Sequence, residues 1–328
     1  MSERPSGAAF LEAESEVFAS YSLTPRTRHL RLQKPDLALR AIEVGSGEPA
    51  LFLHGGGAGS AHWASLMSRL PSLHKIAIDM PGHGASDGVD YSGVDLRPWY
   101  RDLLTGCLDQ LGLESAHIIG HSMGAMFGMW LALDAPERVR SLVAIGTPAV
   151  AFGIDRLGPM RVTALPGIGR LMLSMPTPVF MYRRIMASFL GRHAVDTAPE
   201  ALIRATYLGT RGASHAKTLS TFLNESFRGV RAEPQHYALS ADELARIDKP
   251  VLIIWGRAED GVFLSIAEAK RKAAALIPKA RFEVLPGGHE PWLDDLPGCA
   301  DLVSAFLSTK TSDAGAGPTS RQGHQPAS

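Results

Sequence analysis

The chain has 328 residues, of which 45% are hydrophobic and 20% charged, so it can bury a large core in one α/β domain with an insertion. Lysine plus arginine equals aspartate plus glutamate at 33 each, and no basic stripe is visible, which argues against nucleic acid or an anionic membrane as the main partner. We therefore expect the partner to be a small, weakly charged substrate.

The two cysteines, Cys107 and Cys299, lie far apart and lack C-x-x-C spacing, so neither a disulfide framework nor a zinc site is indicated. The N-terminal stretch carries acidic residues where a signal peptide needs an apolar run, and no run of about 20 apolar residues occurs. These features predict a cytoplasmic protein without a membrane span. The sequence leaves the oligomeric state open, and a homodimer is compatible with it.

Residues 1–26 are polar and irregular in pattern, so we expect a flexible N-terminal segment there. After it, short apolar runs alternate with helical patterns, which is typical of a mostly parallel sheet covered by helices on both faces. The first two strands alternate polar and apolar residues like a hairpin with one face in water, whereas the later runs are continuously apolar. The eight predicted strands are near residues 28–33, 37–44, 50–53, 74–79, 116–121, 139–146, 250–255 and 280–285.

The strand-helix alternation stops from about Thr147 to Lys249, and roughly a hundred residues is too long for a loop in a compact domain. We interpret residues 148–248 as a mainly helical cap, or lid, inserted into a core of residues 27–147 and 249–309. The tail, residues 310–328, has almost nothing apolar to bury and is expected to be disordered. The helices predicted in the core are at about 60–70, 95–111, 123–134, 264–276 and 298–308.

The motif Gly120-His121-Ser122-Met123-Gly124 connects the apolar strand SAHIIG to the helix GAMFGMWLAL. This is the strand-turn-helix context of a nucleophile elbow, in which a strained turn lifts the serine hydroxyl clear of the backbone at a helix N-terminus. Side chains at the two glycines would collide with the neighbouring strand and helix. The motif alone is weak because glycine and serine are common, but its position makes Ser122 the predicted nucleophile.

A serine hydroxyl needs a base, and His289 follows the final strand RFEVL in the loop LPGGHEPW. The histidine in turn needs a carboxylate to fix its tautomer, and the loop after the strand VLIIWG supplies two adjacent candidates, Glu259 and Asp260. Either one completes the chain order serine, acid, histidine.

The run Leu53-His54-Gly55-Gly56-Gly57 follows a buried strand and is suited to an oxyanion hole built from the N–H groups of Gly56 and Met123. A glycine run also suits a phosphate loop, but neither G-x-x-x-x-G-K-[ST] nor the dinucleotide pattern is present here. Histidines near these segments lack metal-binding spacing such as H-E-x-x-H. We therefore expect no metal and no cofactor.

The ordered segments HGGGAGSAHW, DMPGHGASD, GHSMG, VLIIWG with a following acid, and GGHEPW resemble the α/β-hydrolase superfamily over about residues 28–148 and 249–308. The resemblance implies the α/β-hydrolase fold and a structural turn at Asp79, Gly82 and Gly84. Capped esterases, C–C bond hydrolases and epoxide hydrolases are similar to this arrangement.

Positions at which the sequence departs from the family pattern help to choose between the candidate acids and between the candidate reactions. The family usually places its acid three residues after the strand-end glycine, which is Glu259, but Gly261-Val262-Phe263 align better if the acid is Asp260, which we favour. Ser122 stands where epoxide hydrolases and haloalkane dehalogenases carry aspartate, which argues against both. C–C hydrolases of ring-cleavage products commonly have asparagine at the position of His121 and tryptophan at that of Glu290, which weakens this interpretation without excluding it.

The sequence thus predicts a carboxylesterase-like serine hydrolase that cleaves an ester, thioester or lactone through an acyl-enzyme, with Ser122, His289 and Asp260 as its triad. The predicted cap is rich in methionine and phenylalanine, which favours an apolar or aromatic acyl group and equally favours ordinary helix packing. Two alternatives stay open. One is a C–C bond hydrolase with the same triad, and the other is a ligand-binding receptor of the same fold with little turnover.

Overall fold

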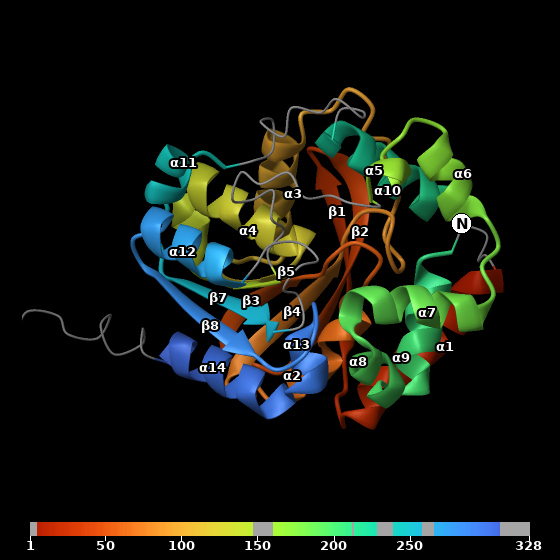
Figure 1. The fold of residues 1–328 in the computed structure, drawn as a ribbon, viewed down its shortest axis with the longest axis horizontal. Helices are drawn as coiled ribbons and strands as arrows, with labels where there is room; N and C mark the ends of the chain where they lie inside the picture. The colour runs from red at the N-terminus through yellow and green to blue at the C-terminus, as the bar shows by residue number, and fades with distance from the viewer. Residues whose placement is uncertain (1–4, 147–159, 212, 228–238, 258–265, 309–328) are drawn as a thin grey trace, which may run out of the picture.

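The computed structural model describes residues 5–146, 160–211, 213–227, 239–257 and 266–308, so the predicted tail at 310–328 lies outside the described residues. The described chain forms an eight-stranded sheet in the order β1-β2-β4-β3-β5-β6-β7-β8, with helices on both faces (Figure 1). All eight predicted strands are confirmed, with ends shifted by at most two residues. The strands are β1 (Arg26–Gln33), β2 (Asp36–Val44), β3 (Glu48–Leu53), β4 (Leu73–Asp79), β5 (Ala116–His121), β6 (Val139–Ile145), β7 (Val251–Gly256) and β8 (Ala280–Leu285).

The first two strands form an antiparallel hairpin, β2 pairs antiparallel with β4, and the remaining pairs are parallel. The central strands are buried on both faces, as their continuous apolar runs predict. Successive residues of a strand point to opposite faces, so in β7 Ile253 joins one hydrophobic core while Ile254 joins the other. Because these strands run parallel, their carboxyl ends lie together at one edge of the sheet. The loops that follow β3, β5, β7 and β8 meet there.

Helices cover each face of the sheet, and the five predicted core helices are present. The core that contains Trp130 is closed by α3 (Leu96–Gln110), α4 (Met123–Asp134), α11 (Ala241–Ala245) and α12 (Ile266–Leu276). The core that contains Trp63 is closed by η1 (Ser60–Trp63), α2 (Ala64–Ser68), α13 (Pro291–Asp294) and α14 (Leu296–Ser308). A short turn of 3-10 helix, η2 (Pro136–Arg138), leads into β6. No helix in the described residues combines the length and apolar composition needed to cross a membrane.

The described residues between β6 and α11 form six helices, which lie to one side of the sheet (Figure 1). Two points of contact bring this insertion to the carboxyl edge of the sheet. The last residue of α7, Leu190, approaches the loop after β8, and Leu219 of α10 approaches the loop after β3. The helices are α5 (Met160–Thr163), α6 (Ile168–Ser174), α7 (Val179–Leu190), α8 (Arg192–Thr197), α9 (Glu200–Gly209) and α10 (Ala213–Phe227).

The expectation of an irregular, flexible segment at residues 1–26 is wrong for most of that range, because Pro5–Ser20 forms the helix α1. Its glutamates made the segment look polar, but its apolar residues recur with helical spacing and are buried in the structure. The buried residues of α1 are Phe10, Ala13, Glu14, Val17 and Phe18. The helix packs along α9 of the insertion, and its residues Ala13, Val17 and Phe18 belong to the core that contains Trp63.

A buried group of three charged side chains connects α1 to the sheet. The Arg40 guanidinium on β2 donates to Glu14 of α1 and, at 3.0 Å, to Asp79 at the end of β4. Asp79 also accepts hydrogen bonds from the Ser60 amide and hydroxyl and from the Ala85 amide, so it organises the turn that the resemblance implied. Burial alone would raise the pKa of Asp79, but Arg40 and Ser60 outweigh burial and lower it. Burial raises the pKa of Glu14 to about 7.

We expect Arg40→Ala to lower the free energy of unfolding by about 3–5 kcal/mol, because the Asp79 carboxylate would then be buried without its cation and Glu14 would lose its hydrogen-bond donor. Arg31→Ala is the matched control, since Arg31 pairs with Asp36 in the same hairpin but both side chains are largely exposed, and its loss should cost less than about 1 kcal/mol. Urea unfolding of both variants measures the difference. Equal small losses would contradict a structural role for the buried group.

Candidate active site

Ser122 occupies the turn between β5 and α4 in a backbone conformation that side chains rarely adopt, with φ 51° and ψ −118°. Such a conformation costs about 1–3 kcal/mol and persists only when its surroundings enforce it. Here the Ser122 amide donates to the Ile145 carbonyl at 2.9 Å, which ties the turn to the end of β6. The serine is half-buried at the N-terminus of α4, as a nucleophile elbow requires.

The two glycines that flank the turn allow close approach of three backbone segments. A Cβ atom at Gly124 would lie 2.1 Å from the Leu53 carbonyl oxygen of β3, and one at Gly120 would lie 2.4 Å from the Gly124 carbonyl oxygen. Both distances are shorter than any tolerated contact with backbone atoms, so a side chain at either position would push the elbow apart.

The loop after β3 lies directly on the elbow. A Cβ atom at Gly55 would lie 2.9 Å from the Ser122 Cβ, and one at Gly56 would lie 3.2 Å from the Met123 sulfur. The Gly57 amide is already used, because it donates to His83 Nε2 at 3.1 Å. Within the described part of the chain, the amides of Gly56 and Met123 donate no hydrogen bond, as expected for two N–H groups kept for an oxyanion.

His289 lies in the loop after β8 and is buried next to His121, the residue before the serine. The centres of the two rings are 4.6 Å apart, and His121 Nε2 donates to the His289 carbonyl at 3.0 Å. A Cβ atom at Gly146, directly after β6, would lie 3.0 Å from His289 Nδ1. The predicted base therefore sits at the same edge of the sheet as Ser122 and the oxyanion loop.

The two candidate acids, Glu259 and Asp260, lie outside the described residues, so their roles stay predictions. The strand that leads to them, β7, ends beside the histidine loop, since a Cβ atom at Gly256 would lie 1.8 Å from the Gly288 carbonyl oxygen. The strand order thus places the start of the acid loop next to His289.

A family model described as the alpha/beta hydrolase fold matches residues 49–296, well over half of the chain. The chain belongs to the α/β-hydrolase family.

This α/β-hydrolase is similar to characterised enzymes of two reaction classes. It is 30% identical over 307 residues to the 2-hydroxy-6-oxononadienedioate/2-hydroxy-6-oxononatrienedioate hydrolase 2 of Pseudomonas putida, covering 88% of this chain and 98% of that protein. Among solved structures it resembles the carboxylesterase CesB of Bacillus subtilis, with a TM-score of 0.74 at 22% identity over 93% of this chain and 99% of the other. It also resembles the 2-hydroxy-6-oxo-6-phenylhexa-2,4-dienoate hydrolase of a Rhodococcus strain, with a TM-score of 0.71 at 19% identity over 87% and 99%.

Three buried histidines support the oxyanion loop of the α/β-hydrolase in their neutral form. His54 donates from Nδ1 to the Gly55 carbonyl and accepts from the Met80 amide, while His83 donates to the Pro81 carbonyl and accepts from Gly57. His215 of α10 packs edge-on against His83, with ring centres 4.6 Å apart. Burial lowers the pKa of His54 to about 4 and that of His83 and His215 to about 3. The surroundings of the loop therefore carry no imidazolium from these three residues at neutral pH.

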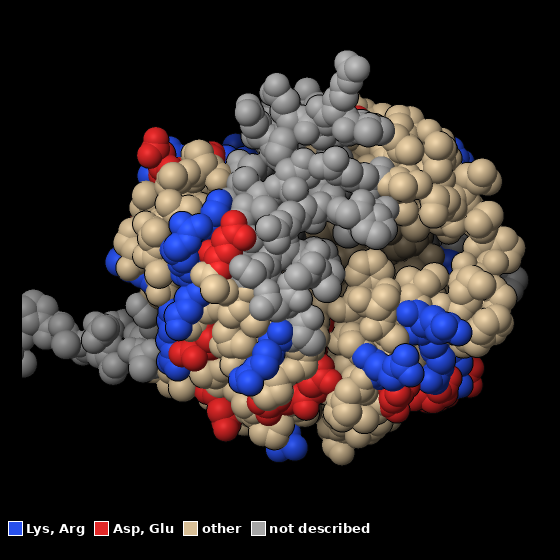
Figure 2. Space-filling view, viewed as in Figure 1, with Lys and Arg blue, Asp and Glu red and all other residues tan. Residues whose placement is uncertain are grey.

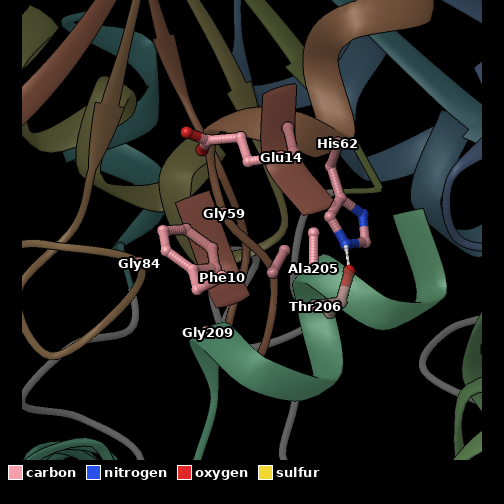
Figure 3. A pocket seen from close by; sticks show the side chains of 10 residues that line it. Phe10, Glu14, Gly59, His62, Gly84, Ala205, Thr206 and Gly209 are labelled. Atoms are coloured by element: carbon pink, nitrogen blue, oxygen red, sulfur yellow. Dashed lines mark hydrogen bonds between the residues drawn. The ribbon is translucent and has the colours of Figure 1, made fainter. Parts of the chain in front are cut away.

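Sequence reasoning missed a buried pair beside the predicted base, formed by His62 of η1 and Glu290. The two side chains are 2.8 Å apart, between His62 Nδ1 and Glu290 Oε2, although 228 positions separate them. On its other side His62 reaches Thr206 of α9 at 2.8 Å, next to a small cavity between α1 and α9 (Figure 3). No spacing in the sequence relates these residues. The only hint in the sequence was that His62 and Glu290 are polar residues close to apolar ones.

Both ring nitrogens of His62 have a hydrogen-bond partner. The Thr206 hydroxyl lies 2.8 Å from His62 Nε2 and 2.7 Å from the Leu202 carbonyl oxygen. The ionised carboxylate of Glu290 can only accept, so His62 Nδ1 donates to it. Burial alone would raise the pKa of Glu290, but the charge and hydrogen bond of His62 outweigh burial and lower it. The contacts of His62 thus join the insertion, η1 and the loop of His289 inside the protein.

We expect Glu290→Gln to lower the free energy of unfolding by about 1–3 kcal/mol, because it removes the buried carboxylate that accepts the hydrogen bond of His62 Nδ1. The matched control is Glu283→Gln, the same change in a half-buried glutamate that pairs with Arg281, with an expected loss of less than about 1 kcal/mol. Urea unfolding measures both.

A double-mutant cycle with His62→Gln separates the interaction from the individual losses. We expect the double variant to be clearly more stable than the sum of the two single losses implies. Strict additivity would mean that the two side chains do not interact.

Proposed function

We propose that this α/β-hydrolase is a serine hydrolase that cleaves an ester, thioester or lactone through an acyl-enzyme. One observation carries the proposal, namely the strained backbone of Ser122 at a strand-to-helix turn, directly beneath a glycine loop. A structural serine gains nothing from such a conformation, whereas a nucleophile needs its hydroxyl exposed above the sheet edge. The burial of His289 next to this turn supports the same role.

In the proposed mechanism the Ser122 oxygen attacks the substrate carbonyl carbon while His289 takes the hydroxyl proton. The negative charge that forms on the carbonyl oxygen is stabilised by the N–H groups of Gly56 and Met123 and by the N-terminus of α4. His289 then gives the proton to the leaving alcohol or thiol, and the acyl group stays on Ser122. A water molecule, deprotonated by His289, attacks the acyl-enzyme, and the acid is released as His289 returns that proton to the Ser122 oxygen. Asp260 orients the histidine throughout.

The surroundings of the oxyanion loop favour an apolar or aromatic acyl group. The Met123 side chain lies against Gly56, and a Cβ atom at Gly56 would lie 3.8 Å from a methyl group of Leu219 on α10. The nearby histidines His54, His83 and His215 are held neutral by burial. An apolar acyl group gains from such surroundings, whereas a charged one would lose its hydration there.

The second candidate is a C–C bond hydrolase of ring-cleavage products with the same catalytic residues. The likeness to the Pseudomonas putida dienedioate hydrolase, which extends over nearly the whole of both chains, supports it. A panel of p-nitrophenyl esters against dienoic 1,5-diketone acids distinguishes the two. Faster turnover of the diketone acids would assign the protein to the C–C class.

We expect a fluorophosphonate probe to add one label to the native protein and none to Ser122→Ala, as read by intact-mass analysis. The probe reports an activated serine whichever of the two reactions is the natural one. The native protein treated after unfolding is the control for nonspecific labelling. An unlabelled native protein would contradict the assignment. Labelling without multiple turnover of any ester or diketone would favour a ligand-binding receptor.

We expect Asp260→Ala to lower kcat for p-nitrophenyl acetate by about 10⁴-fold, because the histidine loses the group that fixes its tautomer. Glu259→Ala is the matched neighbour and should change kcat by less than about tenfold. Steady-state kinetics of the two variants measure the difference. The reverse order would move the role to Glu259.

A further inference from the structure

Large exposed apolar side chains are concentrated in one part of the α/β-hydrolase. Of the eleven that the described residues expose, ten lie between residues 162 and 189, on α5, α6, α7 and the turn between α6 and α7. Single exposed apolar residues are normal on soluble proteins, but a contiguous group marks an interaction surface. The ten residues, which we call the apolar ridge, are Val162, Ile168, Leu171, Met172, Met175, Val179, Phe180, Met181, Ile185 and Phe189.

The spacing of these residues places them in stripes along the helices. On α6 they recur at intervals of three and four residues, from Ile168 to Met175, which puts them on one side of the helix. On α7, Met181, Ile185 and Phe189 recur every four residues, while Met186 and Leu190 are buried against α8 and α9. Helix α7 is therefore apolar on two sides, and one of them has no partner within the described residues. Leu171 and Phe180 are 65% and 66% exposed.

The segment that carries the apolar ridge has only positive charges of its own. Between residues 160 and 195 the sequence has five arginines and neither aspartate nor glutamate. Arg183 pairs with Glu200 of α9, but Arg170, Arg184 and Arg192 are exposed and have no carboxylate partner in the part of the chain that the structure describes. Figure 2 shows blue atoms over α7 and α9, with red atoms next to them, beside the uncharged surface over α6. The zero net charge of the whole chain hides this local excess.

We propose that the apolar ridge docks on a lipid surface with anionic headgroups. Apolar side chains flanked by arginines match the two layers of such a surface, because the side chains enter the acyl boundary while the guanidinium groups pair with phosphates. A second copy of the chain fits less well, since a symmetric contact would bring together two sets of arginines without carboxylates.

Docking would place the lipid surface at the rim of the candidate active site. The last turn of α7 reaches the histidine loop, where a Cβ atom at Gly288 would lie 2.1 Å from the Leu190 carbonyl oxygen. Gly288 directly precedes His289. An amphiphilic ester held in the surface would thus have a short path to Ser122, and this part of the inference rests on the proposed function.

The test is flotation of the full-length protein with vesicles of phosphatidylcholine alone or with about one quarter phosphatidylglycerol. We expect binding to the anionic vesicles that weakens at high salt, and a bound fraction at least about tenfold lower for the double variant Leu171→Ser, Phe180→Ser. Leu11→Ser is the matched control, because Leu11 is the exposed apolar residue outside the ridge, on α1, and it should bind like the parent. Circular dichroism verifies that each variant is folded.

Failure to bind anionic vesicles, or equal binding by the double variant, would overturn the proposal. Light scattering tests whether a second copy of the chain occupies the ridge instead. A parent protein that is dimeric, together with a double variant that is monomeric, would assign the ridge to a contact between two copies. Hydrolysis of soluble p-nitrophenyl acetate without vesicles is measured in parallel and should be equal in the parent and the double variant. Vesicle binding without any hydrolysis would leave docking in place while contradicting the proposed function.

Discussion

The candidate site depends on the close packing of three backbone segments around one serine. The elbow at Ser122 fits only because Gly124 lies against the Leu53 carbonyl of β3 and Gly120 lies against the start of α4. The same packing places the loop after β3 over the serine, with Gly55 against Ser122 and Gly56 against the Met123 side chain. The strain in the turn is maintained because relaxing it would separate the sheet from α4. The position of the predicted nucleophile and of the loop proposed to bind the oxyanion thus follows from one steric constraint.

Two buried groups of charges connect this constraint to the rest of the molecule. Glu14, Arg40 and Asp79 join α1 to the sheet, and His62 with Glu290 joins the helical insertion to the loop of the predicted base. Buried ion pairs add little net stability compared with apolar packing, but removing one partner is costly, so they favour one arrangement of the segments they join. In both cases the group ties the sheet domain to a segment outside it, α1 in the first and the helical insertion in the second. The strand-helix pattern of the sheet domain does not fix the position of either segment.

The sequence by itself determined the elements that depend on short-range patterns. Continuous apolar runs identified the buried strands, because a strand covered on both faces has no polar position. The elbow was predictable for a similar reason, since the strand, the two glycines and the following helix all lie within about twenty residues of Ser122. His289 was recognised by its place after the last strand. The helix at Pro5–Ser20 was missed because its glutamates dominated the composition, although its buried residues follow a helical period.

Only the tertiary structure decided which distant groups meet. His62 and Glu290 are far apart in sequence and carry no shared pattern, so their pairing follows from the sheet order and from the position of α9. The methionines and phenylalanines of α6 and α7 have the spacing of ordinary core residues, and their exposure depends on which neighbours cover each side of the helix. Local sequence sets backbone periodicity, whereas burial and ion pairing arise from contacts between segments whose distances only the completed fold defines.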